Sequence, residues 1–259
     1  MKSIEIQIEN KVAWITFNRP ETFNSFNREM ALSLQSKLDD CEGNDEVRAI
    51  VLTGNGKAFC AGQDLNEVTS PELNPGFRKI LEEHYNPIVT RIRNIEKPII
   101  AAVNGVAAGA GANIALACDI VIASEASSFI QAFSKIGLIP DSAGTFFLPR
   151  LIGFQKASAL MMLGDKVSPQ EAESLGMVYK VVSVDSFTEE VQKVAVKIAH
   201  MPTKALGLIK RLLNESMTNN LTEQLGMESD LQIEAAETKD YSEGVNAFIE
   251  KRKPVFEGR

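Results

Sequence analysis

The chain begins with two short segments in which apolar and polar residues alternate. They are residues 3–9, SIEIQIE, and residues 11–18, KVAWITFN, separated by a short polar connection. Alternation with period two is typical of strands with one buried face, because successive side chains point to opposite sides of a sheet. The pattern predicts a β-hairpin at this end of the chain.

Two later segments are almost continuously apolar, namely residues 49–54, AIVLTG, and residues 97–105, KPIIAAVNG. Such runs are expected of parallel strands buried on both faces. Residues 120–124 and 127–131 predict two more short strands. The alternation of these strands with helical patterns indicates an α/β fold.

Apolar residues at spacings of three and four predict helices over residues 26–42 and 77–95, the second interrupted by Pro87. From residue 154 onward the pattern is almost wholly helical. No linker of low complexity divides the chain. We therefore expect a core over residues 1–200 and a helical C-terminal region over residues 201–259.

Composition and charge restrict the possible partners. The 259 residues are 44% hydrophobic and 24% charged, with a net charge of −7, which argues against binding nucleic acid or an anionic membrane through a basic face. No apolar run approaches the roughly 18 residues of a membrane span. The N-terminal residues do not have the pattern of a signal peptide. We expect a cytoplasmic protein.

Cysteine and histidine offer little chemistry in this chain. Its three cysteines, Cys41, Cys60 and Cys118, are widely separated and predict buried thiols, with neither a disulfide framework nor a metal site. The two histidines, His84 and His200, stand outside any metal-binding or triad motif, and we expect structural or surface roles for them.

Two glycine-containing turns follow the predicted buried strands, over residues 54–65, GNGKAFCAGQDL, and 104–119, NGVAAGAGANIALACD. Small residues at strand ends let backbone N–H groups approach a ligand, and two such groups on one oxygen make an oxyanion hole. Close packing of a helix on a sheet explains such a turn equally well. The spacing fits neither a dinucleotide-binding motif nor a P-loop.

Five motifs in order resemble the crotonase, or enoyl-CoA hydratase/isomerase, superfamily. They are KAFCAGQDL, KPIIAAVNGVAAGAG, CDIVIAS, FSKIGLIPDSAGT and EGVNAFIEKRKP. The resemblance implies a crotonase-like ββα superhelix with a helical C-terminal trimerisation region, assembled as a homotrimer or a dimer of trimers. It also implies an acyl-CoA substrate, whose CoA is part of the substrate and not a separate cofactor.

The resemblance also assigns roles to individual residues. The backbone N–H groups of Gln63 and Ala110 would form the oxyanion hole for the thioester carbonyl. Lys251, in the last helical segment, would approach the nucleotide phosphates. The adenine of CoA would lie against the backbone of four residues: Ala61, Gln63, Asp64 and Leu65.

The chain departs from the hydratases of this family at both catalytic acids. Those enzymes use two glutamates, and the matching positions here are Asn113 and Phe133. Neither an amide nor a phenyl ring can act as a base near neutral pH. In the similar isomerases an aspartate at the position of Asp141 is the general base. The competing interpretation is a helix cap for residues 142–151, since aspartate is a favoured N-cap residue.

We therefore expect an acyl-CoA isomerase with one aspartate base. Within the family, the motifs are most similar to the ring-1,2-epoxyphenylacetyl-CoA isomerases of phenylacetate catabolism, and a 3,2-enoyl-CoA isomerase is the second candidate. An enoyl-CoA hydratase and a non-catalytic acyl-CoA-binding protein remain alternatives. Four phenylalanines could line an aromatic acyl pocket or belong to the core: Phe129, Phe133, Phe146 and Phe147.

Overall fold

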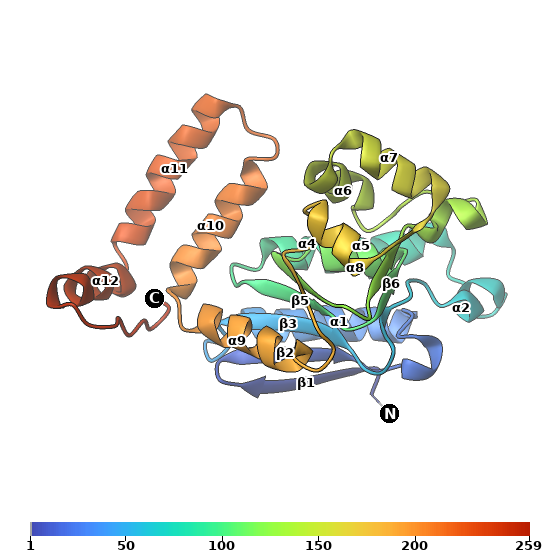
Figure 1. Cartoon of the computed structure of the whole chain (residues 1–259), viewed down its shortest axis with the longest axis horizontal. Helices are drawn as coiled ribbons and strands as arrows, with labels where there is room; N and C mark the ends of the chain where they lie inside the picture. Colours follow the sequence, from blue (N-terminus) through green and yellow to red (C-terminus); the bar gives the residue numbers. More distant parts are fainter. Residues whose placement is uncertain (1) are drawn as a thin grey trace.

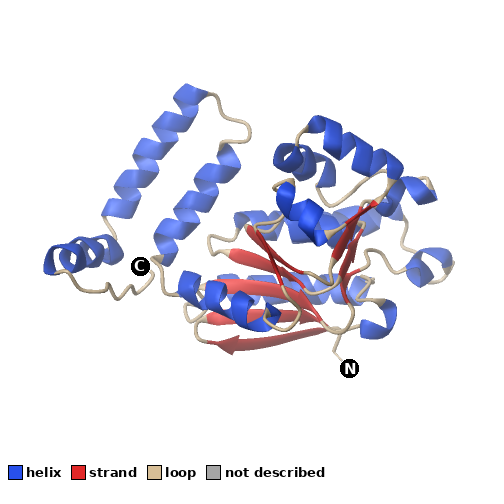
Figure 2. Cartoon of the chain, in the orientation of Figure 1, coloured by secondary structure: helices blue, strands red, loops and turns tan. Residues whose placement is uncertain are grey.

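The computed structural model describes residues 2–259, whose strands form two sheets (Figure 2). The larger sheet has the order β1-β2-β3-β5-β7-β10 and the smaller the order β4-β6-β8-β9. The larger sheet comprises β1 (Ile4–Glu9), β2 (Val12–Phe17), β3 (Ala49–Gly54), β5 (Ile99–Val103), β7 (Ile120–Ser124) and β10 (Lys180–Val182). The smaller comprises β4 (Ala58–Cys60), β6 (Val106–Ala108), β8 (Ser128–Ile130) and β9 (Lys166–Val167).

The predicted hairpin is confirmed. Strands β1 and β2 are antiparallel, with Ile4 opposite Phe17, and the turn residues Asn10 and Lys11 both have positive φ, +52° and +63°. Two consecutive residues of this kind make the tight turn whose twist matches that of paired strands. From β2 onward the larger sheet is parallel.

The predicted buried strands are also confirmed, and each begins a repeating unit. Strands β3, β5 and β7 of the larger sheet are each followed by a short strand of the smaller sheet, namely β4, β6 and β8, and then by helix. The repeated strand-strand-helix unit is the ββα superhelix that the motifs imply. Because the short strands are neighbours, the loops that follow them are brought to one place.

Helices cover both faces of the larger sheet. On one face α1 (Arg28–Glu42) and α4 (Asn86–Asn94) pack over Ile50 and Leu52, and on the other α9 (Phe187–Ala199) packs over Val51. Both sides of β3 are thus fully buried, which explains its continuous apolar sequence.

The helix expected over residues 77–95 is present but changes type along its length. Helix α3 (Phe77–Lys79) leads into a π-helix, Ile80–Tyr85, and this into α4. Pro87 does not break this continuous helix. It has no N–H to donate to the preceding turn, where Gln35 Nε2 instead donates to the carbonyl oxygens of Glu83 (2.7 Å) and His84 (3.2 Å).

Figure 1 shows how the remaining helices surround the two sheets. In order they are a 3-10 helix (Pro20–Thr22), α2 (Leu65–Thr69), α5 (Ala110–Leu116), a second 3-10 helix (Ala132–Ile136), α6 (Gly144–Ile152), α7 (Phe154–Leu163), α8 (Pro169–Ser174), α10 (Thr203–Glu215), α11 (Leu221–Ala236) and α12 (Lys239–Glu250). Helices α10 to α12 project from the body. Among the helices of residues 2–259, none is long and apolar enough to cross a membrane.

The cysteines are buried, as expected, and the two histidines differ in exposure. All three cysteines are buried and free. His84 is buried on the π-helix and His200 is exposed at the end of α9.

Candidate active site

The two glycine-containing turns and the Asp141 segment meet around a single cavity of about 730 Å³. The π-helix and α2 complete its wall. Apolar side chains predominate in the lining, as in most small-molecule sites. The lining residues are Thr22, Phe23, Ser25, Ala61, Gly62, Gln63, Asp64, Leu65, Asn66, Val68, Phe77, Ile80, Leu81, Tyr85, Gly109, Ala110, Ala132, Phe133, Ile136, Leu138 and Asp141.

Two backbone N–H groups at this cavity, those of Gln63 and Ala110, have no acceptor within residues 2–259. Ala110 opens α5, where an N–H has no intrahelical partner. The two turns touch at Gly62, which has φ +94°; a Cβ there would lie 3.0 Å from the Ala108 oxygen and 3.4 Å from the Ala110 nitrogen. The glycine therefore allows the two donors to approach each other.

The side chain of Gln63 is fixed at both ends. The Tyr85 hydroxyl donates to Gln63 Oε1 (2.8 Å), and Gln63 Nε2 donates to Glu67 Oε2 (2.7 Å). Glu67 in turn accepts the backbone N–H of Arg28 (2.8 Å). Tyr85 is fully buried. Its role was not predicted from the sequence, because the π-helix that turns it toward the cavity leaves no mark in the apolar spacing.

The expected adenine-contacting residues lie together on the cavity wall, and most of their polar groups are already used. Asp64 pairs with Arg19 (2.8 Å) and caps α2 through Asn66 N–H (3.0 Å). The N–H groups of Ala61 and Asp64 both donate to backbone carbonyls.

Asp141 faces the cavity, and the competing interpretation that it caps the following helix is wrong. Helix α6 starts at Gly144 with Ala143 at its N-cap, and no side chain caps it. The reason is that Ser142 and Ala143 both have positive φ, +49° and +58°, which turns the chain between Asp141 and the helix. The Asp141 carboxylate instead accepts a hydrogen bond from Ser142 Oγ (2.9 Å).

Burial raises the pKa of the Asp141 carboxyl from 3.8 to about 6, and the hydrogen bond from Ser142 opposes this rise. Desolvation disfavours the charged form of a carboxyl group. The pKa therefore lies close to neutral pH, where a general base works best.

The positions of the two hydratase glutamates carry no charge here. Asn113 is fully buried; its Nδ2 donates to the backbone oxygen of Asp141 (2.9 Å), and its Oδ1 accepts from Gln131 Nε2 (2.7 Å). Phe133 lines the cavity. With no glutamate at these two positions, Asp141 is the carboxylate next to them at the cavity.

The four phenylalanines do not line one aromatic pocket. Phe133 faces the cavity, whereas Phe129 is fully buried in the core. Phe146 and Phe147 line a different cavity. The elements separate these cases: Phe129 lies in β8, Phe133 in the following 3-10 helix, and Phe146 and Phe147 in α6.

Comparison with known proteins matches this architecture. The family model described as enoyl-CoA hydratase/isomerase matches residues 7–259. The chain belongs to the enoyl-CoA hydratase/isomerase family.

Its relatives in this family differ in activity. The chain is similar to a 1,2-epoxyphenylacetyl-CoA isomerase of Escherichia coli (strain K12), 46% identical over 100% of both chains. It is also similar to the 2,3-dehydroadipyl-CoA hydratase of the same organism, 33% identical over 100% of both. A crystal structure of an enoyl-CoA hydratase from Bacillus anthracis superposes with a TM-score of 0.92 at 34% identity, covering 99% of this chain and 100% of the other. The family comprises both isomerases and hydratases, so membership does not decide between them.

Lys251 is not brought to this cavity within one chain. It caps the end of α12, at the opposite end of the molecule from α2 (Figure 1). An approach of Lys251 to the phosphates of a family substrate would therefore need a second copy of the chain.

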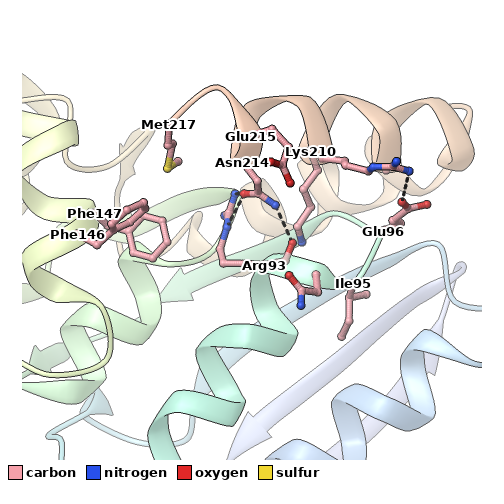
Figure 3. Close-up of a pocket in the computed structure, with 12 residues that line it drawn as sticks. Arg93, Ile95, Glu96, Phe146, Phe147, Lys210, Asn214, Glu215 and Met217 are labelled. Carbon is pink, nitrogen blue, oxygen red and sulfur yellow. Dashed lines mark hydrogen bonds and ion pairs between the residues drawn. The ribbon is translucent and has the colours of Figure 1, made fainter. Parts of the chain in front are cut away.

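A second cavity of about 380 Å³ lies between α4, α6 and α10 (Figure 3). Arg93 bonds Asn214 and Asp119, and Lys210 pairs with Asp119 (2.8 Å). Arg93 also stacks over the Phe147 ring at 5.5 Å. The three cations at this cavity, Arg93, Lys210 and Arg211, are each paired with a carboxylate, so it does not offer the free donors of the first cavity.

Proposed function

We propose that this protein is an acyl-CoA isomerase that moves a proton with Asp141 as its base. The observation that carries the proposal is the pairing, at one cavity, of two free backbone N–H groups with a partly buried carboxylate whose pKa is raised to about 6. The N–H groups of Gln63 and Ala110 would bind the thioester oxygen. Hydrogen-bond donors placed where negative charge develops stabilise such a transition state by about 3 to 4 kcal/mol each.

In this mechanism Asp141 removes a proton from the carbon next to the thioester carbonyl. The electrons of the C–H bond form an enolate, whose oxygen receives both N–H donors. The protonated Asp141 then returns the proton to the γ carbon on the same face, and the double bond moves into conjugation with the thioester. The proton lost is the proton regained, so no cofactor besides the CoA of the substrate is needed.

Two acyl groups are candidates. The 46% identical isomerase supports 1,2-epoxyphenylacetyl-CoA, and with it a place in phenylacetate catabolism. The general proton shuttle equally supports a 3-enoyl-CoA, which would place the protein in fatty acid metabolism.

The second candidate function is hydration of an enoyl-CoA, which the hydratase relatives favour. It would require Asp141 to do the work of two acids, because Asn113 and Phe133 cannot activate water. A non-catalytic acyl-CoA-binding protein is the third alternative, and the unpaired Asp141 argues against it, since a buried carboxylate without a cation costs stability.

The test is to supply the purified protein with a 3-enoyl-CoA, 1,2-epoxyphenylacetyl-CoA and crotonyl-CoA. We expect an absorbance rise from the conjugated product with the first, or conversion of the epoxide in the second. Crotonyl-CoA in ¹⁸O-labelled water should give little labelled hydroxyacyl-CoA. Rapid labelling without isomerisation would favour the hydratase, and tight binding with no turnover would favour the binding protein.

We further propose that the protein works in the cytoplasm as a homotrimer or a dimer of trimers. Large exposed side chains on the projecting helices support an assembly, among them Leu213, Leu225 and Phe248. Sedimentation of the purified chain distinguishes the two states. In such an assembly, Lys251→Ala is expected to raise the KM for a CoA ester without changing kcat.

A further inference from the structure

The segment that presents Asp141 has an unusual backbone. Ser142 and Ala143 are consecutive residues with φ of +49° and +58°, a conformation that costs non-glycine residues free energy and persists only where the surroundings impose it. Ser142 is also nearly fully buried. Something outside the segment must therefore hold it.

The contact that holds it is an amide relay from two other elements. Gln131, just after β8, donates through Nε2 to Asn113 Oδ1 (2.7 Å). Asn113, on α5, donates through Nδ2 to the backbone oxygen of Asp141 (2.9 Å). Because Gln131 occupies the amide oxygen, the amide nitrogen of Asn113 must face Asp141.

The space around Asn113 is matched to this contact. A Cβ on Gly144 would lie 2.3 Å from Asn113 Nδ2, so only glycine lets the start of α6 come this close. Asn113 has no exposed surface and Gln131 is 3% exposed. Gln131 Oε1 is buried with no hydrogen-bond partner in residues 2–259, which costs free energy of folding. Buried amides that specify one orientation in this way fix the position of the groups they bind.

We propose that Asn113, oriented by Gln131, is a positioning residue that holds Asp141 at the cavity in the geometry of a base. The proposal rests on the proposed function, and it gives a task to the residue that stands where hydratases carry a glutamate. Asn113 acts through the backbone of Asp141 and touches no reacting atom in this role.

The ionisable groups that share the cavity with Asp141 are bonded to other residues, so the relay is the main contact that sets the position of Asp141. The one side chain of residues 2–259 that bonds the Asp141 carboxylate is Ser142. Tyr85 and Asp64 line the same cavity, but Tyr85 donates to Gln63 and Asp64 is paired with Arg19. Lys135, on the neighbouring 3-10 helix, lays its carbon chain near Gly164.

The test replaces Asn113 by leucine, which is similar in size and uncharged. We expect kcat of the isomerisation to fall about 100-fold, the loss typical of a misplaced catalytic group, with KM changed less than threefold. In the substrate-free protein, ¹³C NMR titration of the Asp141 carboxyl should show its pKa falling from about 6 toward 3.8, because a released segment exposes the carboxylate. Gln131→Leu should give a smaller change in the same direction, about tenfold in kcat.

Asn214→Leu is the matched control. The Asn214 amide is also held at both atoms, with Nδ2 donating to the backbone oxygen of Arg93 (2.9 Å) and Oδ1 accepting from Arg93 Nε (3.0 Å), and neither residue lines this cavity. Its effect on stability should resemble that of the relay variants, with the titration of Asp141 and kcat unchanged.

An Asn113→Leu protein that titrates like the unmodified protein and keeps kcat within threefold would overturn the proposal. If that variant does not fold, Gln131→Leu decides by the same two measurements. If the unmodified protein isomerises no CoA ester, the proposed function fails, and the NMR titration still decides whether Asn113 positions Asp141.

Discussion

One aspartate lines the larger cavity and another lies behind the smaller one, and the two have opposite surroundings. Asp119, behind the smaller cavity, accepts from Arg93 (3.1 Å) and Lys210 (2.8 Å) and from the N–H of Ile99 (2.8 Å). Asp141, in the larger cavity, has no cation partner among residues 2–259, and the side chain that donates to it is that of its neighbour Ser142. The two side chains have the same chemistry and differ in what surrounds them.

The difference separates a structural carboxylate from a reactive one. Burial lowers the pKa of the Lys210 ammonium, and Asp119 opposes that shift, so each charge makes the other tolerable. At Asp141 no cation compensates the burial among residues 2–259, and although the hydrogen bond from Ser142 opposes the shift, the pKa of the carboxyl is still raised to about 6. Substitution of each aspartate by asparagine should therefore give opposite results.

The largest expected effect is on activity at Asp141. Asp141→Asn removes the base while preserving shape, and we expect kcat to fall about 10³-fold or more, within the range attributed to general bases. Turnover of the best CoA ester measures it. Retention of the full rate would show that another group takes the proton.

Asp119→Asn should instead reduce stability and preserve activity. It leaves Arg93 and the nearly buried Lys210 without their carboxylate, and breaking a buried pair in this way costs about 3 kcal/mol or more in the free energy of unfolding. Urea denaturation measures the loss. A normal kcat in the folded variant is the second expected result, and a strongly reduced kcat would remove the contrast between the two cavities.

The pH dependence of stability sharpens the comparison. Because the pKa of Asp141 is raised to about 6 in the folded chain, its neutral form contributes stability that is complete below pH 3.8 and lost as the pH rises through 6. The amide side chain of the Asp141→Asn variant stays neutral at every pH. The free energy of unfolding of this variant, relative to that of the unmodified protein, should therefore be up to about 3 kcal/mol higher at pH 8 than at pH 4. Urea denaturation at both pH values tests the sign, and a gain that is equal at pH 4 and pH 8 would contradict it.

The smallest expected effect is at Tyr85. Tyr85→Phe removes the hydroxyl that donates to Gln63 and should lower kcat about tenfold by loosening an oxyanion donor, with little change in KM. Steady-state kinetics measure this. Arg91→Lys is the control on the same helical segment, because Arg91 pairs with exposed Asp39 and lies outside the cavity; a loss of equal size in both variants would argue against a role for the hydroxyl.

Much of the fold could be predicted from the sequence, because strands buried on one or both faces differ in apolar pattern. The hairpin and the strands β3 and β5 follow from this alone. The ββα arrangement and the choice of Gln63, Ala110 and Asp141 came from motif resemblance. The structure brings these three to one cavity.

What could not be predicted depends on backbone angles and on small rotations. The interpretation of Asp141 as a helix cap is wrong because Ser142 and Ala143 adopt positive φ, which cannot be predicted from a serine or an alanine in the sequence. Phe129 and Phe133 lie close together in the sequence. The pairing of β8 with β6 is what directs the Phe129 side chain into the core.

The π-helix at Ile80–Tyr85 has a consequence for how the cavity wall can vary. A residue in an α-helix advances the chain by about 100° around the axis, and a π-turn accommodates one residue more than an α-turn. The π-helix therefore sets the rotation of α3 about the helix axis relative to α4. Deleting one residue from it would rotate every side chain before the deletion by about a quarter-turn relative to α4. The wall could then present a different set of side chains to the acyl group while α4 keeps its packing on the sheet.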